Sequence, residues 1–359
     1  MELDLEARFV TYGVPALSLI RKAWMCCAVG AGMFAIPASA QEYTLVKLGV
    51  AKGYTSAINA GGEISLSLKI GDDEDAPAVY RDGKIIQLAP YGSANAIDKF
   101  GDVVGNAGYG MLWPRKGDPI QIPAPRGKSA VIPLGINEAK LVTGYYYDAR
   151  VPRCFTWTPE GGSMDLDYGA GKHIASCHAQ GINQRGEIAG TANDGKATRA
   201  FVYRHDHIHL LPLLKGTDYC EGSAINDSGD ILGVCNAQGS GAEYGRPVLW
   251  HDGKPKDISP AGDGIDFIVG SMNNVGVIVG NLSTTCCEQY KPAVYTPEAG
   301  WQLLNDLIPD PANWIVTSAT GVNDDGVVSG MGTNAWNYDV VIELVPQLAA
   351  KPHIPGDMQ

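Results

Sequence analysis

The stretch Gly181-Ile182-Asn183-Gln184-Arg185-Gly186-Glu187-Ile188-Ala189-Gly190 decides the fold, because variants of it recur along the chain. Its pattern is a small residue, an apolar residue, Asn, two residues, Gly, one residue, Ile or Val, one residue and Gly. Seven copies occur, with their Asn or Asp at positions 59, 98, 137, 183, 226, 273 and 323. A repeat of about 44 residues predicts an array of one supersecondary unit.

Each copy predicts a tight β-hairpin. The Asn side chain can close an Asx-turn, and the Gly supplies a positive φ. The flanking residues alternate small and β-branched types, as half-buried strands do. Lys140 stands where the third copy should have Gly, and Leu66 stands where the first copy should have its closing Gly. We expect altered turns in these two copies.

A third strand follows each hairpin, and a fourth strand follows it in every copy but the last. The third strand ends in a large residue, namely Tyr80, Trp113, Trp157, Tyr203, Trp250 and Tyr295 in the first six copies. A second turn such as Arg81-Asp82-Gly83 and a short fourth strand such as 85–88 come next. Four antiparallel strands in about 44 residues are typical of one β-propeller blade.

The last copy lacks a fourth strand, because only the tail 347–359 follows its third one. Residues 43–48 precede the first copy and have the composition of an orphan strand. Pairing the two would remove exposed sheet edges. The sequence therefore predicts an all-β fold, a seven-bladed β-propeller of four-stranded blades over residues 41–346, closed by an N-terminal strand that completes the last blade. Six blades or an open array are the alternatives.

The first 40 residues differ from the rest of the chain. Arg21 and Lys22 precede an apolar stretch, and Ala38-Ser39-Ala40 forms a small-x-small cleavage pattern. We interpret residues 1–40 as a signal peptide and expect a secreted or periplasmic protein, with a retained membrane anchor as the alternative. Downstream of the leader we expect no membrane span.

The charge pattern bears on the partners. The net charge of −12 comes without a run of Lys and Arg, so we expect no nucleic-acid partner. We expect the protein to be a monomer.

Six cysteines remain after the leader, and an even number in an exported chain predicts disulfides. Cys220 and Cys235 are equidistant from the turn of one hairpin, so they should face each other. Cys154 is the candidate partner of Cys177. The adjacent Cys286 and Cys287 could form a vicinal disulfide, remain free or bond elsewhere.

The repeat resembles the bacterial HAF repeat, an extracellular repeat named for a His-Ala-Phe triplet that opens its third strand. Arg199-Ala200-Phe201 and Arg153-Cys154-Phe155 stand at this place here, and Arg246-Pro247-Val248 and Lys291-Pro292-Ala293 are more divergent versions. The His is never present, so the resemblance rests on the hairpins, which cover nearly the whole mature chain. The resemblance implies export and a propeller, and it brings no catalytic residues.

The loops between the second and third strands are the candidate binding site. They vary most in length, and variable loops on a rigid scaffold are common sites of binding. Aromatic, Arg and carboxylate side chains gather in them, a mixture suited to a glycan or a protein partner. The candidate residues of this face are Tyr146, Asp148, Arg150, Tyr244, Arg246, Tyr290 and Trp336.

Two other clusters are interpreted as solvated turns. His205, His207 and His209 align with the outer turn of other repeats, and the acidic run 72–75 lacks the layout of a calcium loop. We therefore assign no metal and no cofactor. The sequence carries no nucleophile motif or phosphate loop.

Three hypotheses for the function follow. The first is an exported, non-catalytic propeller that recognises a glycan or a protein. The second is an extracellular polysaccharide hydrolase or lyase, which would need two carboxylates, or a His and a carboxylate, at the central channel. The third is a structural envelope protein.

Overall fold

The computed structural model describes residues 41–125, 130–166, 174–236, 245–260, 266–283, 290–336 and 338–347. These ranges contain 28 β-strands and the short 3-10 turn η2 (Leu304–Leu307), so the prediction of an all-β fold is confirmed. Among the residues so described, no helix is long and apolar enough to cross a membrane.

The strands form five four-stranded sheets and one eight-stranded sheet. Three of the four-stranded sheets come from the first three repeats: β2 (Gly53–Ile58), β3 (Ile64–Lys69), β4 (Asp75–Arg81) and β5 (Lys84–Gln87); β6 (Ser93–Ile97), β7 (Val103–Asn106), β8 (Gly110–Trp113) and β9 (Ile120–Ile122); β10 (Val131–Ile136), β11 (Val142–Asp148), β12 (Val151–Thr158) and β13 (Gly162–Asp165). In each sheet the strands are antiparallel and lie side by side in chain order.

The eight-stranded sheet combines two repeats. Its strands are β14 (Ser176–Ile182), β15 (Ile188–Asn193), β16 (Thr198–Arg204), β17 (His207–Leu210), β18 (Tyr219–Ile225), β19 (Ile231–Asn236), β20 (Arg246–His251) and β21 (Lys254–Asp257). A single parallel bridge, Thr198 to Tyr219, joins the two halves. Each half alone has the hairpin order of the other sheets.

The last two sheets come from the C-terminal repeats. The first consists of β22 (Asp266–Met272), β23 (Ile278–Ser283), β24 (Lys291–Thr296) and β25 (Gly300–Leu303). The second consists of β26 (Trp314–Val322), β27 (Val328–Asn334), β28 (Asp339–Pro346) and β1 (Tyr43–Val50). β1 pairs antiparallel with β28 from Tyr43 opposite Pro346 to Val50 opposite Val340.

The hairpin turn uses the repeated Asn as the sequence predicts. In Asn183 the side-chain oxygen accepts the main-chain N–H groups of Arg185 (3.1 Å) and Glu187 (2.9 Å), and Gly186 has a φ of 77°. The expectation of an altered turn at Lys140 is wrong. Lys140 itself adopts a φ of 57° and donates its N–H to the Asn137 carbonyl, so the turn keeps the common form at the cost of a strained backbone.

The same Asn side chains also link neighbouring hairpins. Five of these side-chain amides donate to the main-chain carbonyl of the next Asn or Asp along the repeat order: Asn59 to Asp98 (3.0 Å), Asn137 to Asn183 (3.0 Å), Asn183 to Asn226 (3.0 Å), Asn273 to Asn323 (2.8 Å) and Asn323 to Asn59 (3.2 Å). The hairpin turns therefore gather at one end of the sheets, here called the hairpin end.

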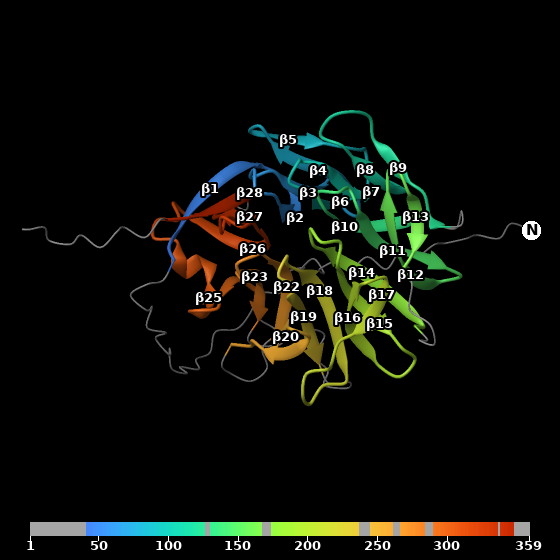
Figure 1. Cartoon of the computed structure of the whole chain (residues 1–359). Helices are drawn as coiled ribbons and strands as arrows, with labels where there is room; N and C mark the ends of the chain where they lie inside the picture. The colour runs from blue at the N-terminus through green and yellow to red at the C-terminus, as the bar shows by residue number, and fades with distance from the viewer. Residues whose placement is uncertain are drawn as a thin grey trace, which may run out of the picture. The chain divides into compact units, whose positions relative to one another are not determined.

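The small residue of the repeat allows neighbouring first strands to approach closely. A Cβ on Gly181 would lie 3.1 Å from the Ala224 Cα of the next hairpin. Figure 1 shows the first strands β2, β6, β10, β14, β18, β22 and β26 gathered toward the middle, with β5, β9, β13 and β25 farther out.

The core lies between adjacent sheets. Val104 and Leu112 of one sheet cluster with Phe155 and Trp157 of the next, and all four are buried. The large residue that ends the third strand is thus a core residue, as Trp250 (1% exposed) also illustrates. Since apolar faces of this kind contribute about 2 kcal/mol per buried large side chain, the contacts between sheets hold the fold together.

Candidate functional site

The end of the sheets opposite the hairpin turns, here called the loop end, carries the variable loops. The turns between the second and third strands and the beginnings of the first strands lie there, because the strands of each sheet alternate in direction. Exposed aromatic rings gather at this end: Tyr54, Tyr91, Tyr109, Tyr147, Trp336 and Tyr338, which are 44% to 81% exposed. We call these six residues the aromatic rim. At the hairpin end the exposed large apolar residues include Phe100 and Val275.

Tyr146 does not belong to the exposed face. Its ring is 2% exposed in the core with Val104 and Phe155, and its hydroxyl donates to Asp165 Oδ1 (2.5 Å). The assignment of Tyr146 to a ligand-binding face is therefore corrected, because side chains alternate along β11 and Tyr146 shares the buried side of Val142. Its neighbour Tyr147, 44% exposed, takes its place on the rim.

Asp148 and Arg150 lie at the loop end as predicted. Asp148 is half-buried at the last position of β11, and Arg150 is exposed in the tight turn before β12. Ala149 and Arg150 have φ values of 50° and 73°, which is the left-handed backbone that a two-residue hairpin turn requires.

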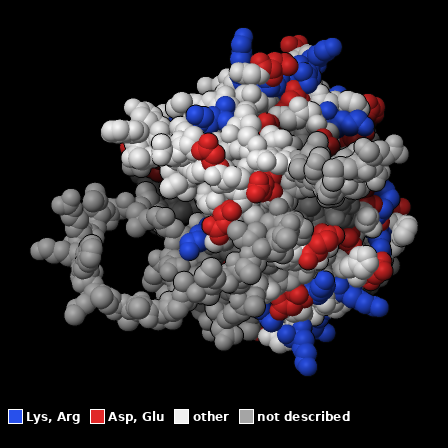
Figure 2. All heavy atoms as spheres, turned by 90° about the vertical axis from the view of Figure 1, so that its left-hand side faces the viewer, with Lys and Arg blue, Asp and Glu red and all other residues white. Residues whose placement is uncertain are grey.

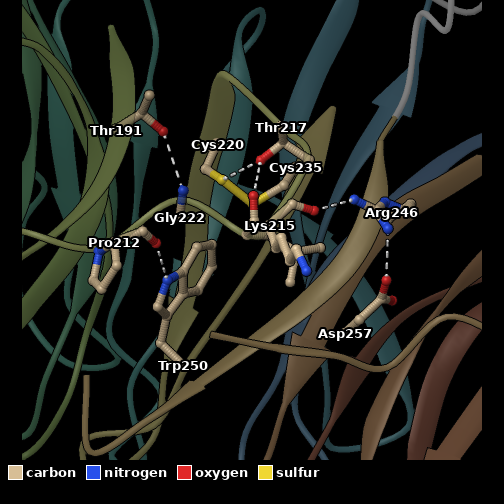
Figure 3. The surroundings of a disulfide bond; sticks show 11 residues. Thr191, Pro212, Lys215, Thr217, Cys220, Gly222, Cys235, Arg246, Trp250 and Asp257 are labelled. Atoms are coloured by element: carbon tan, nitrogen blue, oxygen red, sulfur yellow. Dashed lines mark hydrogen bonds and ion pairs between the residues drawn. A yellow bond between two sulfur atoms is a disulfide. The ribbon is translucent and has the colours of Figure 1, made fainter. Parts of the chain in front are cut away.

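Arg246 is held in place by its neighbours. Its Nη1 atom lies 2.9 Å from Asp257 Oδ2, and Nη2 donates to the Lys215 carbonyl at 3.3 Å (Figure 3). Arg246 is thus engaged in a local network next to Cys235, with which it pairs across β19 and β20.

Of the three remaining predicted face residues, the structure describes Trp336 and Tyr290. Trp336 (81% exposed) is on the rim, and its main-chain N–H donates to Asn334 Oδ1. Tyr290 is half-buried just before β24. Tyr244 lies outside the described residues.

Two predicted disulfides are present. Cys220 and Cys235 face each other across β18 and β19 (Figure 3), and Cys154 of β12 is bonded to Cys177 of β14. The second bond joins two sheets. The predicted Cys286 and Cys287 pair falls outside the described residues.

A cluster of four polar side chains that the sequence does not reveal lies next to cysteines of both disulfides. We call it the His178 cluster, and it consists of Tyr145 of β11, His178 of β14, and Tyr219 and Glu221 of β18. The Tyr145 and His178 rings meet edge to face with centroids 4.5 Å apart, and the Tyr219 hydroxyl donates to the Glu221 carboxylate. All four side chains are half-buried, so each keeps an accessible part.

The electrostatics of the cluster favour a neutral imidazole. Burial lowers the pKa of His178 below its ordinary value, and the Glu221 carboxylate opposes part of this shift. A neutral imidazole offers one hydrogen-bond donor and one acceptor. Beside it, the Glu221 carboxylate offers acceptors only, so the pair can recognise hydroxyl groups or exchange a proton with them.

The cluster is continuous with the aromatic rim. The Tyr147 ring packs edge to face against Tyr145, with centroids 5.7 Å apart. His178 and Glu221 are the third residues of their strands, near the loop end. A path of rings therefore leads from exposed Tyr147 through Tyr145 to His178.

A signal for this cluster exists in the repeat. His178 and Glu221 both stand five residues before their hairpin Asn, where other copies have Tyr54, Ser93 and Ile132. Comparison of this position among the copies would have shown a His and a carboxylate on neighbouring first strands. Tyr145 carries no such signal, because its contact with His178 joins two different sheets.

The two clusters interpreted as turns are turns in part, because His207 and His209 lie in β17 and Asp75 lies in β4. His205 and Asp206 have positive φ values of 50° and 62° between β16 and β17. In the acidic run, Asp75 opens β4 and lies 3.8 Å from Lys69 Nζ. Within the described ranges, no group of three His, Cys, Asp or Glu side chains is arranged to hold a metal ion.

The surface charges are mixed. On the described surface drawn in Figure 2, Lys and Arg side chains are interspersed with Asp and Glu.

Comparison of the sequence with protein-family profiles and with curated proteins gave no match. Solved structures are similar in fold. One of two prolyl endopeptidases has 12% identity and a TM-score of 0.50, covering 84% of this chain and 47% of its own. A gluconolactonase from Xanthomonas campestris has 10% identity and a TM-score of 0.45, covering 85% and 90%. TolB from Acinetobacter baumannii has 12% identity and a TM-score of 0.43, covering 80% and 81%.

At such low identity, similarity shows the fold alone. Four-stranded antiparallel sheets with their first strands gathered toward the middle define the class as a β-propeller. Function has to be argued from the site itself.

Proposed function

We propose that this chain is an exported seven-bladed β-propeller that binds a glycan through its loop end, without catalysis. Seven blades are counted when the eight-stranded sheet is divided at its single bridge between Thr198 and Tyr219. Closure of the ring is supported twice. β1 completes the sheet of β26, β27 and β28, and the Asn323 amide donates to the Asn59 carbonyl of the first hairpin.

Export is supported by the disulfides. Cys154–Cys177 and Cys220–Cys235 are bonds of the kind that oxidising compartments allow. The proposed leader, residues 1–40, lies outside the described residues. We also propose that the repeats of this chain are HAF repeats. This resemblance rests on the Asn-containing hairpins, which are also the elements that form the sheets.

The observation that carries the binding proposal is the aromatic rim. Exposed aromatic rings gathered at one end of a rigid scaffold are typical of a binding surface. Tyr and Trp combine an apolar face with a polar tip, so they can stack on the C–H faces of sugars while their polar atoms bind hydroxyl groups. Trp336, at 81% exposed, has the most accessible of these rings.

The proposal is tested by binding to a panel of immobilised polysaccharides. The protein, produced in an oxidising compartment, is compared with a Tyr147→Ala/Trp336→Ala variant. We expect reproducible binding to at least one polysaccharide and a loss of affinity of about 10-fold or more in the variant. The matched control is Phe100→Ala/Val275→Ala, which removes exposed apolar side chains at the hairpin end and should bind normally.

Two results would contradict the proposal. A folded protein that retains none of the polysaccharides would refute the glycan and point to a protein partner. Equal loss in the rim variant and in the hairpin-end control would show that the loop end is not the binding surface.

The His178 cluster favours one second candidate, a polysaccharide hydrolase or lyase. A His and a carboxylate on the first strands of neighbouring repeats are suited to proton transfer. Prolonged incubation with the bound polysaccharide tests this alternative. New reducing ends or an unsaturated product absent from a Glu221→Gln variant would establish catalysis, and an unchanged polymer would leave binding as the function.

A further inference from the structure

We infer that the His178 cluster is the primary sugar subsite, and that it takes an uncharged pyranose residue of a longer glycan bound along the aromatic rim. This inference rests on the proposed glycan binding and specifies where and by what chemistry the glycan is recognised. Four observations support it.

The first is hydrogen-bonding capacity. Sugar hydroxyl groups both donate and accept, and the cluster offers both functions side by side. The Glu221 carboxylate accepts, the neutral His178 imidazole does either, and the Tyr219 hydroxyl already bonded to Glu221 fixes the carboxylate. Hydrogen bonds to an ionised group are the stronger kind, so Glu221 should contribute most to affinity.

The second is charge. The Glu221 carboxylate is the charged group whose field acts on His178, and the imidazole beside it is held neutral by burial. A uronate or sulfated sugar would place a second anion near this half-buried carboxylate, which costs free energy. The subsite should therefore select neutral sugars.

The third is pre-organisation. Each residue of the cluster neighbours a disulfide: Cys177 precedes His178, Cys220 lies between Tyr219 and Glu221, and Cys154 pairs directly with Tyr145. Both described disulfides thus brace the same place in the fold. Side chains held on a braced backbone lose less entropy when a ligand binds.

The fourth is continuity. The ring path from Tyr147 to Tyr145 and His178 gives a ligand apolar contact from the rim to the cluster. A single sugar could occupy the cluster, and the following sugars could stack on the rim.

The test measures binding by isothermal titration, with the neutral glucose oligomer cellotetraose, the N-acetylglucosamine oligomer chitotetraose and the uronate oligomer tetragalacturonate as probes. We expect at least one neutral oligomer to bind at least 10-fold more tightly than tetragalacturonate. For that oligomer, His178→Ala and Glu221→Gln should each weaken binding by about 10-fold or more.

Ser93→Ala is the matched control, because Ser93 holds the equivalent repeat position of His178 on the distant strand β6. It should bind within two-fold of the unaltered protein. Thermal unfolding of every variant shows whether a loss of binding comes with a loss of folding, and Glu221→Gln keeps the size and an acceptor of the original side chain.

Failure of the inference and failure of the proposed function are distinguishable. Binding that is lost in Tyr147→Ala/Trp336→Ala but unchanged in both His178→Ala and Glu221→Gln overturns the subsite and leaves the rim proposal standing. Preference for tetragalacturonate also overturns it. If the protein binds immobilised polysaccharides but none of the three oligomers, the assignment of an uncharged pyranose to the subsite is also wrong.

Discussion

At the residue scale, Asp98 stands where the other six repeats have their hairpin Asn. Its Oδ1 atom accepts the N–H groups of Phe100 and Asp102, both at 2.9 Å, as the Asn side chains do. An Asp lacks the amide donor that would reach the next hairpin at Asn137. The Asp98 Oδ2 atom is buried, and among the described residues it has no hydrogen-bond partner.

Burial raises the pKa of Asp98 above its ordinary value of 3.8. The Asp102 carboxylate raises this pKa further, whereas the N–H donors and Lys140 lower it. A raised pKa in the folded state means that the stabilising contribution is complete below the ordinary value. It is lost as the pH rises through the folded-state pKa.

Asp98→Asn should therefore stabilise the protein, because it restores the donor and removes a buried charge. We expect a gain of about 1 kcal/mol in the free energy of unfolding at pH 7, and little or no gain near pH 3.5. Urea unfolding at both pH values measures it. The reverse change Asn137→Asp should destabilise the protein at pH 7, and an Asp98→Asn variant no more stable than the original at pH 7 would refute this account.

At the scale of elements, the strands that each disulfide joins determine how much it stabilises the fold. Cys220–Cys235 closes the hairpin of β18 and β19 over 15 residues, and Cys154–Cys177 ties β12 to β14 over 23 residues. Both bonds constrain short segments of the unfolded chain. Chain entropy predicts a similar contribution from each, about 3 kcal/mol.

The double variant Cys220→Ser/Cys235→Ser should lose about 3 kcal/mol of unfolding free energy under oxidising conditions. Addition of a reductant should then cost this variant less than it costs the original protein. Chemical denaturation with and without reductant measures both effects. Equal stability of the variant and the original in oxidising buffer would show that this bond contributes nothing.

The element scale also shows why some predictions succeeded and others did not. The hairpins follow from local chemistry, since Asn and a left-handed residue are sufficient to form the turn, and Lys140 can adopt that backbone too. The prediction of an exposed Tyr146 is wrong because Tyr146 lies an even number of residues from buried Val142, and side chains alternate between the two faces of β11. The contact of Tyr145 with His178 joins separate sheets, so no local pattern could predict it.

At the scale of the whole described fold, closure decides whether the loop end is one surface. Trp336 and Tyr338 come from the last repeat, whereas Tyr54 comes from the first. They belong to a common rim only if the last sheet meets the first. In the closed ring that we propose, the pairing of β1 with β28 and the Asn323 to Asn59 hydrogen bond are the contacts that join them.

The most direct measurement is therefore a crosslink between β1 and β28. Thr44 and Val345 are directly opposite in the register, and paired antiparallel residues are close enough for a disulfide. In a Thr44→Cys/Val345→Cys variant, a closed ring predicts an intrachain bond, found by mass spectrometry as a linked pair of peptides in the monomer. The single variant Thr44→Cys should give none. Free thiols, or bonds formed only between chains, would show that β1 does not complete the last sheet and would contradict the closed propeller.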